Sequence, residues 1–274
     1  MKVAERVAIV TGGGNGIGSA LAAKLAQQDA RVVVADLDAN AARVVADGIN
    51  AERPGAAIAA GADAADTAQI QRLITLAESG FGGPVDLFFA NAGITGVVGL
   101  EATEKEWDRS IDVNLRAHIR AAQLLIPGWV ERGEGYFIST ASAAGLLTQL
   151  GSATYAVTKH AAVGFAEWLN ITYGDQGVRV SCLCPMGVNT KLLYEGEQSG
   201  HPLGDLATRA VTTAGDVLEP ADVANSVLAA IEEERFLILP HAGVLDMYRQ
   251  KATDYDRWLS GMRRYQRSLM EEAQ

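Results

Sequence analysis

The amino-acid sequence predicts an α/β protein of the Rossmann type, with a doubly wound, seven-stranded, mostly parallel sheet and helices on both of its faces. Short runs of β-branched and aromatic residues alternate with longer, alanine-rich stretches that have helical spacing. The short runs are apolar almost throughout, which is typical of strands covered on both faces. Right-handed crossovers between such strands place the helices on both sides of the sheet.

Each predicted element follows from its local composition. The predicted strands are RVAIV (6–10), RVVVA (31–35), AAIAAG (56–61), VDLFFA (85–90), GYFIST (135–140), VRVSCLC (178–184) and RFLIL (235–239). The amphipathic segments between them are predicted as helices over 17–28, 39–50, 66–79, 103–131, 152–174 and 220–233.

The chain is predicted to hold a single Rossmann-fold domain over residues 1–240, because no linker, repeat or low-complexity tract divides it. This domain carries a loop-rich insert at 186–218, which is rich in Gly, Thr and Glu and is expected to face the substrate. Residues 241–274 are expected to form a helical C-terminal extension. Its aromatic and basic side chains indicate that it packs on the domain or on a neighbouring subunit.

Composition excludes several classes of function. The net charge of −10 disfavours nucleic acid and anionic membrane surfaces as partners. No apolar run reaches the roughly 20 residues of a membrane span, and the N-terminus lacks the long apolar core of a signal peptide, so a cytoplasmic protein is expected. Cys182 and Cys184 are two apart in a predicted strand, where they cannot form a disulfide without distortion. The histidines are scattered and form no cluster with the cysteines, so no metal site is predicted.

A glycine-rich turn, TGGGNGIG (11–18), lies between the first predicted strand and the first predicted helix. It departs from G-x-G-x-x-G, because no three of its five glycines have that spacing; the pattern present is Gly12-x-x-x-Gly16-x-Gly18. Glycines there let the backbone approach a pyrophosphate, and the helix N-terminus supplies N–H donors. A purely structural turn is the alternative, but the position between strand and helix favours a nucleotide site.

Asp36 closes the second predicted strand, 18 residues after Gly18. A carboxylate at this point accepts hydrogen bonds from the ribose hydroxyls of an adenosine and repels a 2′-phosphate. Neither Leu37 nor Asn15 is a cation that would hold that phosphate, so NAD is predicted rather than NADP. The alternative role for Asp36 is a helix N-cap, for which Asp38 is better placed.

With these residues the sequence resembles the short-chain dehydrogenase/reductase family, in its short-subunit, NAD-preferring branch. The resemblance spans about residues 5–190, and the matching positions are TGGGNGIG (11–18), Asp36, Asp63, NAG (91–93), Asn114, Ser142 and YAVTK (155–159). Ser142 stands 13 residues before Tyr155, which is the spacing of the family. The family's Pro-Gly-x-Val-x-Thr segment reads PMGVNT (185–190), in which Met186 replaces the first glycine.

The resemblance implies which residues hold the cofactor. Asp63 contacts the adenine with Ala64 beside it, and Ile17 lies beneath the pyrophosphate. Val188 and Thr190 hold the nicotinamide carboxamide. The whole implied set is Gly12, Asn15, Gly16, Ile17, Gly18, Asp36, Leu37, Asp63, Ala64, Asn91, Ala92, Gly93, Tyr155, Lys159, Pro185, Gly187, Val188 and Thr190.

Oxidation of an alcohol transfers a hydride to the cofactor and releases a proton, which requires a base. Free tyrosine has a pKa of about 10 and is a poor base at neutral pH. Lys159 lies one helical turn from Tyr155, on the same face, so its charge and that of the oxidised nicotinamide are expected to lower the pKa of the phenol. Packing alone is the alternative for such a pair, but Ser142, Asn114 and the glycine turn favour catalysis.

Two further residues complete the implied catalytic set. The Ser142 hydroxyl follows the fifth predicted strand and can hold the substrate oxygen. The resemblance implies that Asn114 holds a water that relays protons past Lys159. A buried, hydrogen-bonded amide is the alternative for Asn114, since an amide in mid-helix competes with the backbone.

The substrate is expected where the carboxyl ends of the strands meet the nicotinamide. The candidate lining is mostly apolar: Ile94, Thr95, Leu146, Gln149, Leu150, Met186, Leu192, Leu193 and Tyr194. No basic cluster among these residues would anchor a carboxylate or a phosphopantetheine. The predicted activity is therefore NAD-dependent interconversion of a hydrophobic, cyclic or aromatic secondary alcohol and its ketone.

Other functions stay open from the sequence. One is a 3-oxoacyl thioester reductase or 3-hydroxyacyl dehydrogenase, which Asp36 and the absence of a basic entrance disfavour. Another is a non-catalytic Rossmann protein that senses NAD, which would not need Ser142, Tyr155 and Lys159 together. The segments 103–131 and 152–174 correspond to the helices that the family commonly uses for association, so a homodimer or homotetramer is expected.

Overall fold

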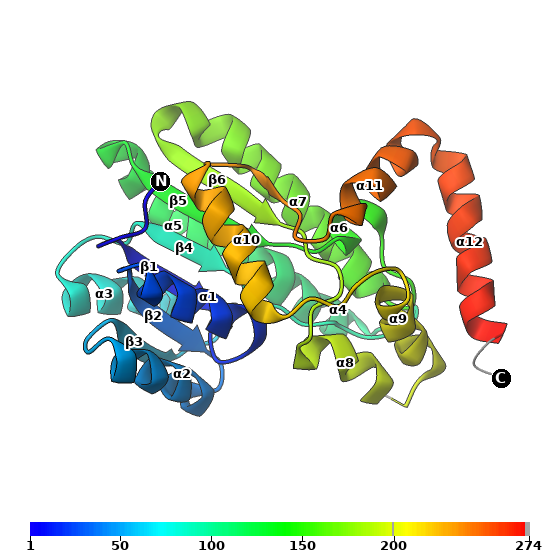
Figure 1. Cartoon of the computed structure of the whole chain (residues 1–274), viewed down its shortest axis with the longest axis horizontal. Helices are drawn as coiled ribbons and strands as arrows, with labels where there is room; N and C mark the ends of the chain where they lie inside the picture. Colours follow the sequence, from blue (N-terminus) through cyan, green and yellow to red (C-terminus); the bar gives the residue numbers. More distant parts are fainter. Residues whose placement is uncertain (199, 272–274) are drawn as a thin grey trace.

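The computed structural model describes residues 1–198 and 200–271, and it confirms the predicted fold class (Figure 1). Seven parallel strands form one sheet in the order β3-β2-β1-β4-β5-β6-β7. Ala8 of β1 pairs with Val32 of β2 on one side and Leu87 of β4 on the other. The strand order therefore reverses at β1, and in a doubly wound sheet the crevice for a ligand lies at the carboxyl ends of the strands beside this point.

The strands are short and separated by helices. They are β1 (Val7–Thr11), β2 (Arg31–Asp36), β3 (Ala57–Gly61), β4 (Leu87–Ala90), β5 (Gly135–Thr140), β6 (Val178–Leu183) and β7 (Leu237–Ile238). The helices are α1 (Gly16–Gln27), α2 (Ala39–Glu52), α3 (Thr67–Phe81), α4 (Glu104–Ile111), α5 (Ala117–Arg132), α6 (Ala144–Leu147), α7 (Ala153–Tyr173), α8 (Lys191–Gln198), α9 (Pro202–Thr212), α10 (Pro220–Glu232), α11 (Gly243–Thr253) and α12 (Tyr255–Glu271). A π-helical segment, η1 (Asp112–Arg116), joins α4 to α5, and a 3₁₀ turn, η2 (Gly174–Gln176), follows α7.

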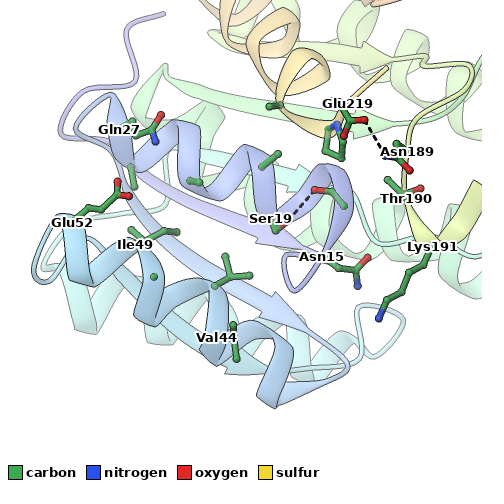
Figure 2. A pocket seen from close by; sticks show the side chains of 18 of the residues that line it. Asn15, Ser19, Gln27, Val44, Ile49, Glu52, Asn189, Thr190, Lys191 and Glu219 are labelled. Atoms are coloured by element: carbon green, nitrogen blue, oxygen red, sulfur yellow. Dashed lines mark hydrogen bonds between the residues drawn. The ribbon is translucent and has the colours of Figure 1, made fainter. Parts of the chain in front are cut away.

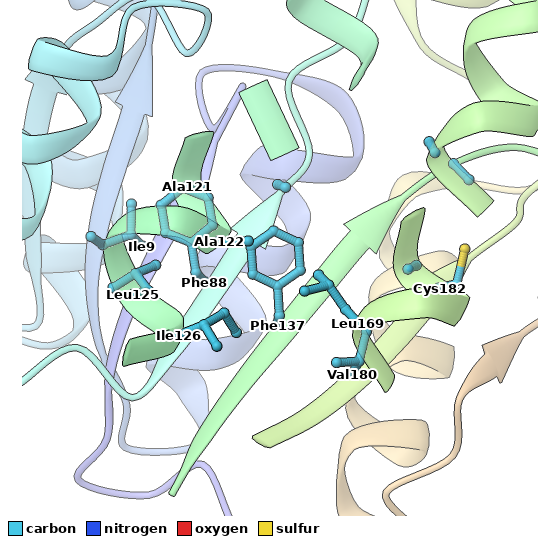
Figure 3. Close-up of a cluster of buried hydrophobic side chains, with 14 of the residues drawn as sticks. Ile9, Phe88, Ala121, Ala122, Leu125, Ile126, Phe137, Leu169, Val180 and Cys182 are labelled. Atoms are coloured by element: carbon cyan, nitrogen blue, oxygen red, sulfur yellow. The ribbon is translucent and has the colours of Figure 1, made fainter. Parts of the chain in front are cut away.

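Two apolar cores cover the two faces of the sheet. On one face, Phe88 and Phe137 stack with ring centroids 5.9 Å apart and pack with side chains of α3, α5 and α7 (Figure 3). On the other face, Phe89 packs with side chains of α1, α2 and α10. Phe88 and Phe89 lie in different cores because successive residues of a strand point to opposite faces. Burial on both faces accounts for the nearly continuous apolar runs in the sequence.

One predicted helix proves to be three segments. The stretch predicted as a helix over 103–131 begins with α4, whose cap is Thr103, passes through the π-helical η1, and continues as α5. Asn114 in η1 hydrogen bonds to the backbone of Ile94, in the loop after β4. Tertiary contacts of this kind stabilise a bulge that helical periodicity in the sequence does not reveal.

The insert predicted to be loop-rich is instead largely helical, so that prediction is wrong. It contains α8 and α9, and α9 starts with His201 as the N-cap and Pro202 at the first helical position. The His201 ring nitrogen accepts a hydrogen bond from the N–H of Leu203 at 3.1 Å. A proline in the first turn is a helix-start signal that the glycine and threonine content of the segment obscured.

The C-terminal extension is helical, as the sequence predicted for 241–274, with residues 272–274 and the insert's residue 199 lying outside the described part of the chain. Helices α11 and α12 follow one another beside α6 and α9 (Figure 1). Leu269 of α12 is buried against Leu206 and Ala210 of α9, and Tyr265 donates a hydrogen bond to the carbonyl of Ala210. No helix within residues 1–198 and 200–271 is both long enough and apolar enough to cross a membrane.

Candidate active site

A cavity of about 790 Å³ extends along the carboxyl ends of the strands and joins two groups of residues that are distant in sequence. One end is lined by the turns after β1, β2, β3 and β4. The other end is lined by the loop after β5, the start of α7, and parts of α8, α9, α11 and α12. The arrangement combines a polar end made by strand termini with a more apolar end made by helices.

The glycine turn forms the floor of the polar end. Gly16 begins α1 with a φ of +53°, a left-handed conformation that favours glycine. A Cβ on Gly18 would overlap the carbonyl oxygen of Gly12, so only glycine fits where α1 packs against the turn. The side chain of Asn15 makes no cap bond to α1. The first residues of α1, Gly16, Ile17 and Gly18, line the cavity, and an anion is favoured at a helix N-terminus with unpaired N–H groups.

Asp36 lies at the end of β2 and faces this turn. Its Oδ2 accepts a hydrogen bond from the N–H of Gly14 at 2.9 Å, and its Oδ1 accepts one from the N–H of Asp38 at 3.0 Å. Asp38 is the residue that caps α2, because its side chain accepts from the N–H groups of Asn40 and Ala41. Asp36 is therefore not the helix cap, and its carboxylate retains lone pairs toward the cavity that it lines.

Arg109 is a cavity residue that sequence reasoning missed. It projects from α4, and its guanidinium forms an ion pair with Asp63, Nη1 to Oδ2, at 3.3 Å. Asp63 follows β3 and holds its own turn by accepting from the N–H of Ala65. The contact joins segments more than 40 residues apart, and no local motif in the sequence marks Arg109 for this position.

Asn91 holds three strand ends together. Its Nδ2 donates to the carbonyl of Thr11 at 3.0 Å, and its Oδ1 accepts from the hydroxyl of Thr140 at 3.2 Å. The ends of β1, β4 and β5 are thereby tied at the middle of the cavity. Ala92 and Gly93 continue along the same wall.

Ser142, Tyr155 and Lys159 meet beside this junction. Ser152 caps α7, so that Tyr155 lies in its first turn and Lys159 one turn later. The Lys159 Nζ donates to the carbonyl of Thr140 at 3.0 Å and lies 5.6 Å from the centre of the Tyr155 ring. Lys159 and Ser142 are both buried, and all three residues line the cavity.

Desolvation is the largest influence on the pKa values of Tyr155 and Lys159. It raises the pKa of the Tyr155 phenol, while hydrogen bonding to Ser142 opposes the rise, and Cys184 and Glu195 add smaller increases. Burial also lowers the pKa of the Lys159 ammonium to about 8. Our expectation that Lys159 lowers the pKa of Tyr155 is therefore not met in the protein without cofactor, because desolvation raises this pKa and the one group that lowers it is Ser142.

Asn114 is fully buried, and its side-chain amide has three partners. Its Oδ1 accepts from the N–H of Ile94 at 2.9 Å, and its Nδ2 donates to the carbonyl of Ile94 and to Thr158 Oγ1. A Cβ on Gly93 would lie 3.3 Å from Asn114 Oδ1 and 3.4 Å from Lys159 Nζ. Asn114 therefore positions the loop after β4, and it does so close to the lysine.

The segment Pro185–Thr190 is held by a residue that the sequence did not single out. The buried His241 accepts a hydrogen bond from the N–H of Met186 at 3.1 Å, and its Nε2 donates to the carbonyl of Gly187 at 2.9 Å. Pro185, Met186, Val188 and Thr190 line the cavity, whereas Gly187 does not. His241 thus fixes the backbone at the position where Met186 replaces the glycine of the family.

Most of the predicted substrate residues line the apolar end, namely Ile94, Thr95, Gln149, Leu150, Met186, Leu192 and Leu193. The prediction is wrong for Leu146 and Tyr194. The Leu146 side chain is buried in the core, and its carbonyl accepts a hydrogen bond from Lys251 of α11. Tyr194 follows Leu193 on α8, where a step of about 100° along the helix turns it away from the cavity.

The C-terminal extension, predicted only to be helical and to pack on the domain or on a neighbouring subunit, supplies residues to the cavity. Met247 of α11 and Trp258, Met262 and Tyr265 of α12 line the apolar end. The α12 residues follow a spacing of four and then three, which puts them on one face of the helix. This periodicity was the signal that could have predicted them.

A second hollow of about 740 Å³ lies between α1, α2 and the start of α10 (Figure 2). Its lining includes Val44 and Ile49, and at its rim Asn189 donates to Glu219 at 2.9 Å. Ser142, Tyr155 and Lys159 do not line it. The predicted catalytic residues therefore line the first cavity and not this hollow.

Comparison with known sequences places this arrangement in a family. The model of the family described as short chain dehydrogenase matches residues 6–200. The chain belongs to this family. This short-chain dehydrogenase is accordingly an oxidoreductase that acts on CH–OH groups.

Two relatives and one solved structure show the range of the similarity. The dehydrogenase is 33% identical to cyclohexanol dehydrogenase of Acinetobacter sp. (strain SE19), over 89% of this chain and 95% of the relative. It is 34% identical to 1-deoxy-11-beta-hydroxypentalenate dehydrogenase of Streptomyces exfoliatus, over 95% and 92%. A short chain dehydrogenase/reductase from Burkholderia phymatum, solved in complex with NAD, superimposes with a TM-score of 0.84 at 30% identity, covering 93% of this chain and 96% of that chain.

Proposed function

We propose that this short-chain dehydrogenase interconverts a hydrophobic, cyclic secondary alcohol and its ketone with NAD as cofactor. The observation that carries the proposal is the position of Tyr155. Tyr155 is half-buried and lines the cavity that joins the polar end, formed by the turns after the strands, to the apolar end lined by helices. A hydride acceptor at the polar end and a carbon substrate at the apolar end would meet beside this hydroxyl.

The residues at the polar end fit NAD. The turn Gly12–Gly18 and the start of α1 offer N–H donors for the pyrophosphate. The Asp36 carboxylate has lone pairs for the adenosine ribose and would repel a 2′-phosphate. The guanidinium of Arg109, a cation at the same end, is paired with Asp63. The relative from Burkholderia phymatum is described in complex with NAD, which supports the same cofactor here.

The bound cofactor supplies a hydride acceptor or donor and, when oxidised, a positive charge. During oxidation, Tyr155 takes the hydroxyl proton of the substrate, and Ser142 donates a hydrogen bond to the substrate oxygen. Since burial raises the pKa of Tyr155, positive charge beside it is needed to favour the phenolate. Lys159, held by Thr140 and 5.6 Å from the ring, supplies one such charge.

The proton taken by Tyr155 must leave a half-buried site. Lys159 Nζ lies 5.6 Å from the centre of the Tyr155 ring, and it approaches the same position beside Gly93 that Asn114 Oδ1 approaches. We therefore assign Lys159 and the π-helical turn around Asn114 to the path along which the proton passes, with Asn114 keeping the loop after β4 in place.

The apolar end supports a carbocyclic substrate. Its walls are formed by leucine, methionine and aromatic side chains, including Leu193, Met262 and Trp258. The named activity of the Acinetobacter relative on cyclohexanol is consistent with a substrate of this shape. No cluster of basic side chains surrounds this end among the described lining residues, so an acyl thioester with a phosphopantetheine arm is disfavoured.

We also propose that the enzyme works as a homodimer or homotetramer. Members of the family commonly associate, and α7 exposes Val157, Trp168 and Ile171 to solvent, the last with 83% of its surface accessible. A second copy of the chain would cover these side chains.

The test is a spectrophotometric assay at 340 nm, with NAD⁺ and separately NADP⁺, against cyclic, aromatic and aliphatic secondary alcohols and a 3-hydroxyacyl thioester. We expect NADH formation with cyclic alcohols and little reaction with NADP⁺. Turnover restricted to the thioester would contradict the assigned substrate. If no alcohol gives NADH while calorimetry shows that the protein binds NAD, a non-catalytic NAD sensor would be favoured.

A further inference from the structure

The charged side chains of the cavity are unevenly placed. Among the described residues that line it, Asp36, Asp63 and Arg109 lie at the polar end and Lys159 lies beside Tyr155. The remaining charged residue is Glu195 of α8. It therefore provides the single ionisable acid in a wall that is otherwise apolar or carries neutral polar groups.

Glu195 is held across the mouth of the cavity. The hydroxyl of Thr95, in the loop after β4, donates to Glu195 Oε2 at 2.9 Å. The bond joins α8 to a segment 100 residues earlier in the chain, and both residues line the cavity. The second carboxylate oxygen, Oε1, accepts no hydrogen bond from the described residues, so it can receive a donor from a bound molecule.

The carboxylate also lies near the reacting centre. Its negative charge is among the influences that raise the pKa of Tyr155, so the two groups share one electrostatic environment. Tyr155 and Glu195 line the same cavity, so a ring that places its reacting carbon at Tyr155 has the wall that contains Glu195 among its surroundings. The chemistry of that wall then decides which substituents are accepted.

We propose that Glu195 is a specificity-determining residue, which accepts a hydrogen bond from a second hydroxyl group of the substrate and disfavours anionic substrates. This inference rests on the proposed function, and it narrows the substrate class to cyclic alcohols with a second, distal hydroxyl. An ionised acceptor strengthens a hydrogen bond, and the Glu195 carboxylate repels a second carboxylate brought within a few ångströms of it, although its exposure to solvent weakens both effects.

The kinetic test compares Glu195→Gln with Glu197→Gln, a matched control on the same helix whose side chain does not line the cavity. The substrates are cyclohexanol and the 1,4-cyclohexanediols. We expect Glu195→Gln to lower the ratio of kcat/KM for diol over cyclohexanol about tenfold, while Glu197→Gln leaves this ratio unchanged. An unchanged ratio in Glu195→Gln would overturn the proposal.

A purely structural role, in which Glu195 only holds α8 against the loop after β4, gives a different result. Thr95→Val removes the contact to α8 and keeps the carboxylate. If Glu195 only holds α8, Thr95→Val and Glu195→Gln will lower kcat/KM equally for diol and cyclohexanol, which would contradict specificity. A selective effect confined to Glu195→Gln supports it.

The anionic arm uses 4-hydroxycyclohexanecarboxylate. We expect it to be a poor substrate of the natural enzyme and to gain about tenfold in kcat/KM in Glu195→Gln, because the repelling charge is removed. A preference of the natural enzyme for this acid over cyclohexanol would overturn the inference.

Equilibrium binding separates this inference from the proposed reaction. Calorimetry of 1,4-cyclohexanediol and cyclohexanol with the enzyme–NADH complex needs no turnover. We expect the diol to bind more tightly to the natural enzyme and to lose this advantage in Glu195→Gln. Equal affinities in the natural enzyme would overturn the role of Glu195, whatever the outcome of the turnover assay.

Discussion

The two ends of the cavity are built in different ways. Apart from Arg109 of α4, the polar end is made by turns that lie within a few residues of the ends of β1, β2, β3 and β4, so most of its residues come from local motifs. The apolar end is assembled by long-range contacts, such as Lys251 with Leu146 and Thr95 with Glu195. The difference teaches that the nucleotide end is fixed by the fold, whereas the substrate end can vary through α8, α9 and the C-terminal helices.

The largest expected effect tests the junction between the two ends. Tyr155→Phe removes the hydroxyl that takes the proton while keeping the ring, so kcat should fall by at least about a thousandfold. The affinity for NAD, measured by calorimetry, should change little. If the variant keeps substantial turnover of the true substrate, Tyr155 is not the base.

The next prediction concerns Asp36 at the polar end and its role in binding NAD rather than NADP. Asp36→Asn removes the charge that favours ribose hydroxyls and repels a 2′-phosphate, so the Kd for NAD should rise about tenfold and discrimination against NADP should weaken. Asp38→Asn is the control, since asparagine also caps a helix well. Equal effects of the two substitutions on cofactor affinity would show that Asp36 acts through the turn alone.

A smaller effect is expected at the point where the C-terminal extension reaches the segment after β6. His241→Ala removes two hydrogen bonds to Met186 and Gly187, so the free energy of unfolding should fall by about 2 kcal/mol. The Kd for NAD should rise about threefold, because the segment before Val188 loses its support. His160→Ala, at an exposed position on α7, is the control. Lost stability with unchanged NAD affinity would restrict His241 to a structural role.

The smallest effect concerns the pH profile. Oxidation needs the Tyr155 phenolate, so kcat should rise with pH and reach a plateau above the pKa of the phenol. Glu195 raises that pKa, so Glu195→Gln should stabilise the phenolate and move the rise by about a few tenths of a unit toward lower pH. Salt should shrink the difference, since Glu195 is exposed. A movement toward higher pH would contradict the sign of this coupling.

The sequence was most informative where function depends on short-range spacing. The glycine turn, Asp36 at the end of β2, and the pair Tyr155 and Lys159 on one helical turn all lie in the cavity as predicted. Because the sheet is buried on both faces, its strands are nearly continuous apolar runs, and these runs allowed the strands to be predicted from the sequence. These features follow from local geometry, which a pattern of residues reports directly.

The rest depended on contacts that no local pattern contains. The π-helical turn around Asn114 is stabilised by Ile94, and Arg109 faces the cavity beside Asp63. Leu146 was predicted among the apolar residues near the carboxyl ends of the strands, yet its side chain on α6 is buried in the core. The direction of the Tyr155 pKa also escaped the sequence, because desolvation depends on everything that surrounds the phenol.

The most direct test of the account follows the hydride. The enzyme would be incubated with NAD⁺ and cyclohexanol that carries deuterium at the carbinol carbon, and the NADH would be analysed by mass spectrometry. We predict NADH that contains one deuterium, together with a slower reaction than with unlabelled alcohol. Unlabelled NADH, or intact NAD binding with no NADH from any cyclic alcohol, would contradict the claim that this cavity brings an alcohol carbon to NAD beside Tyr155.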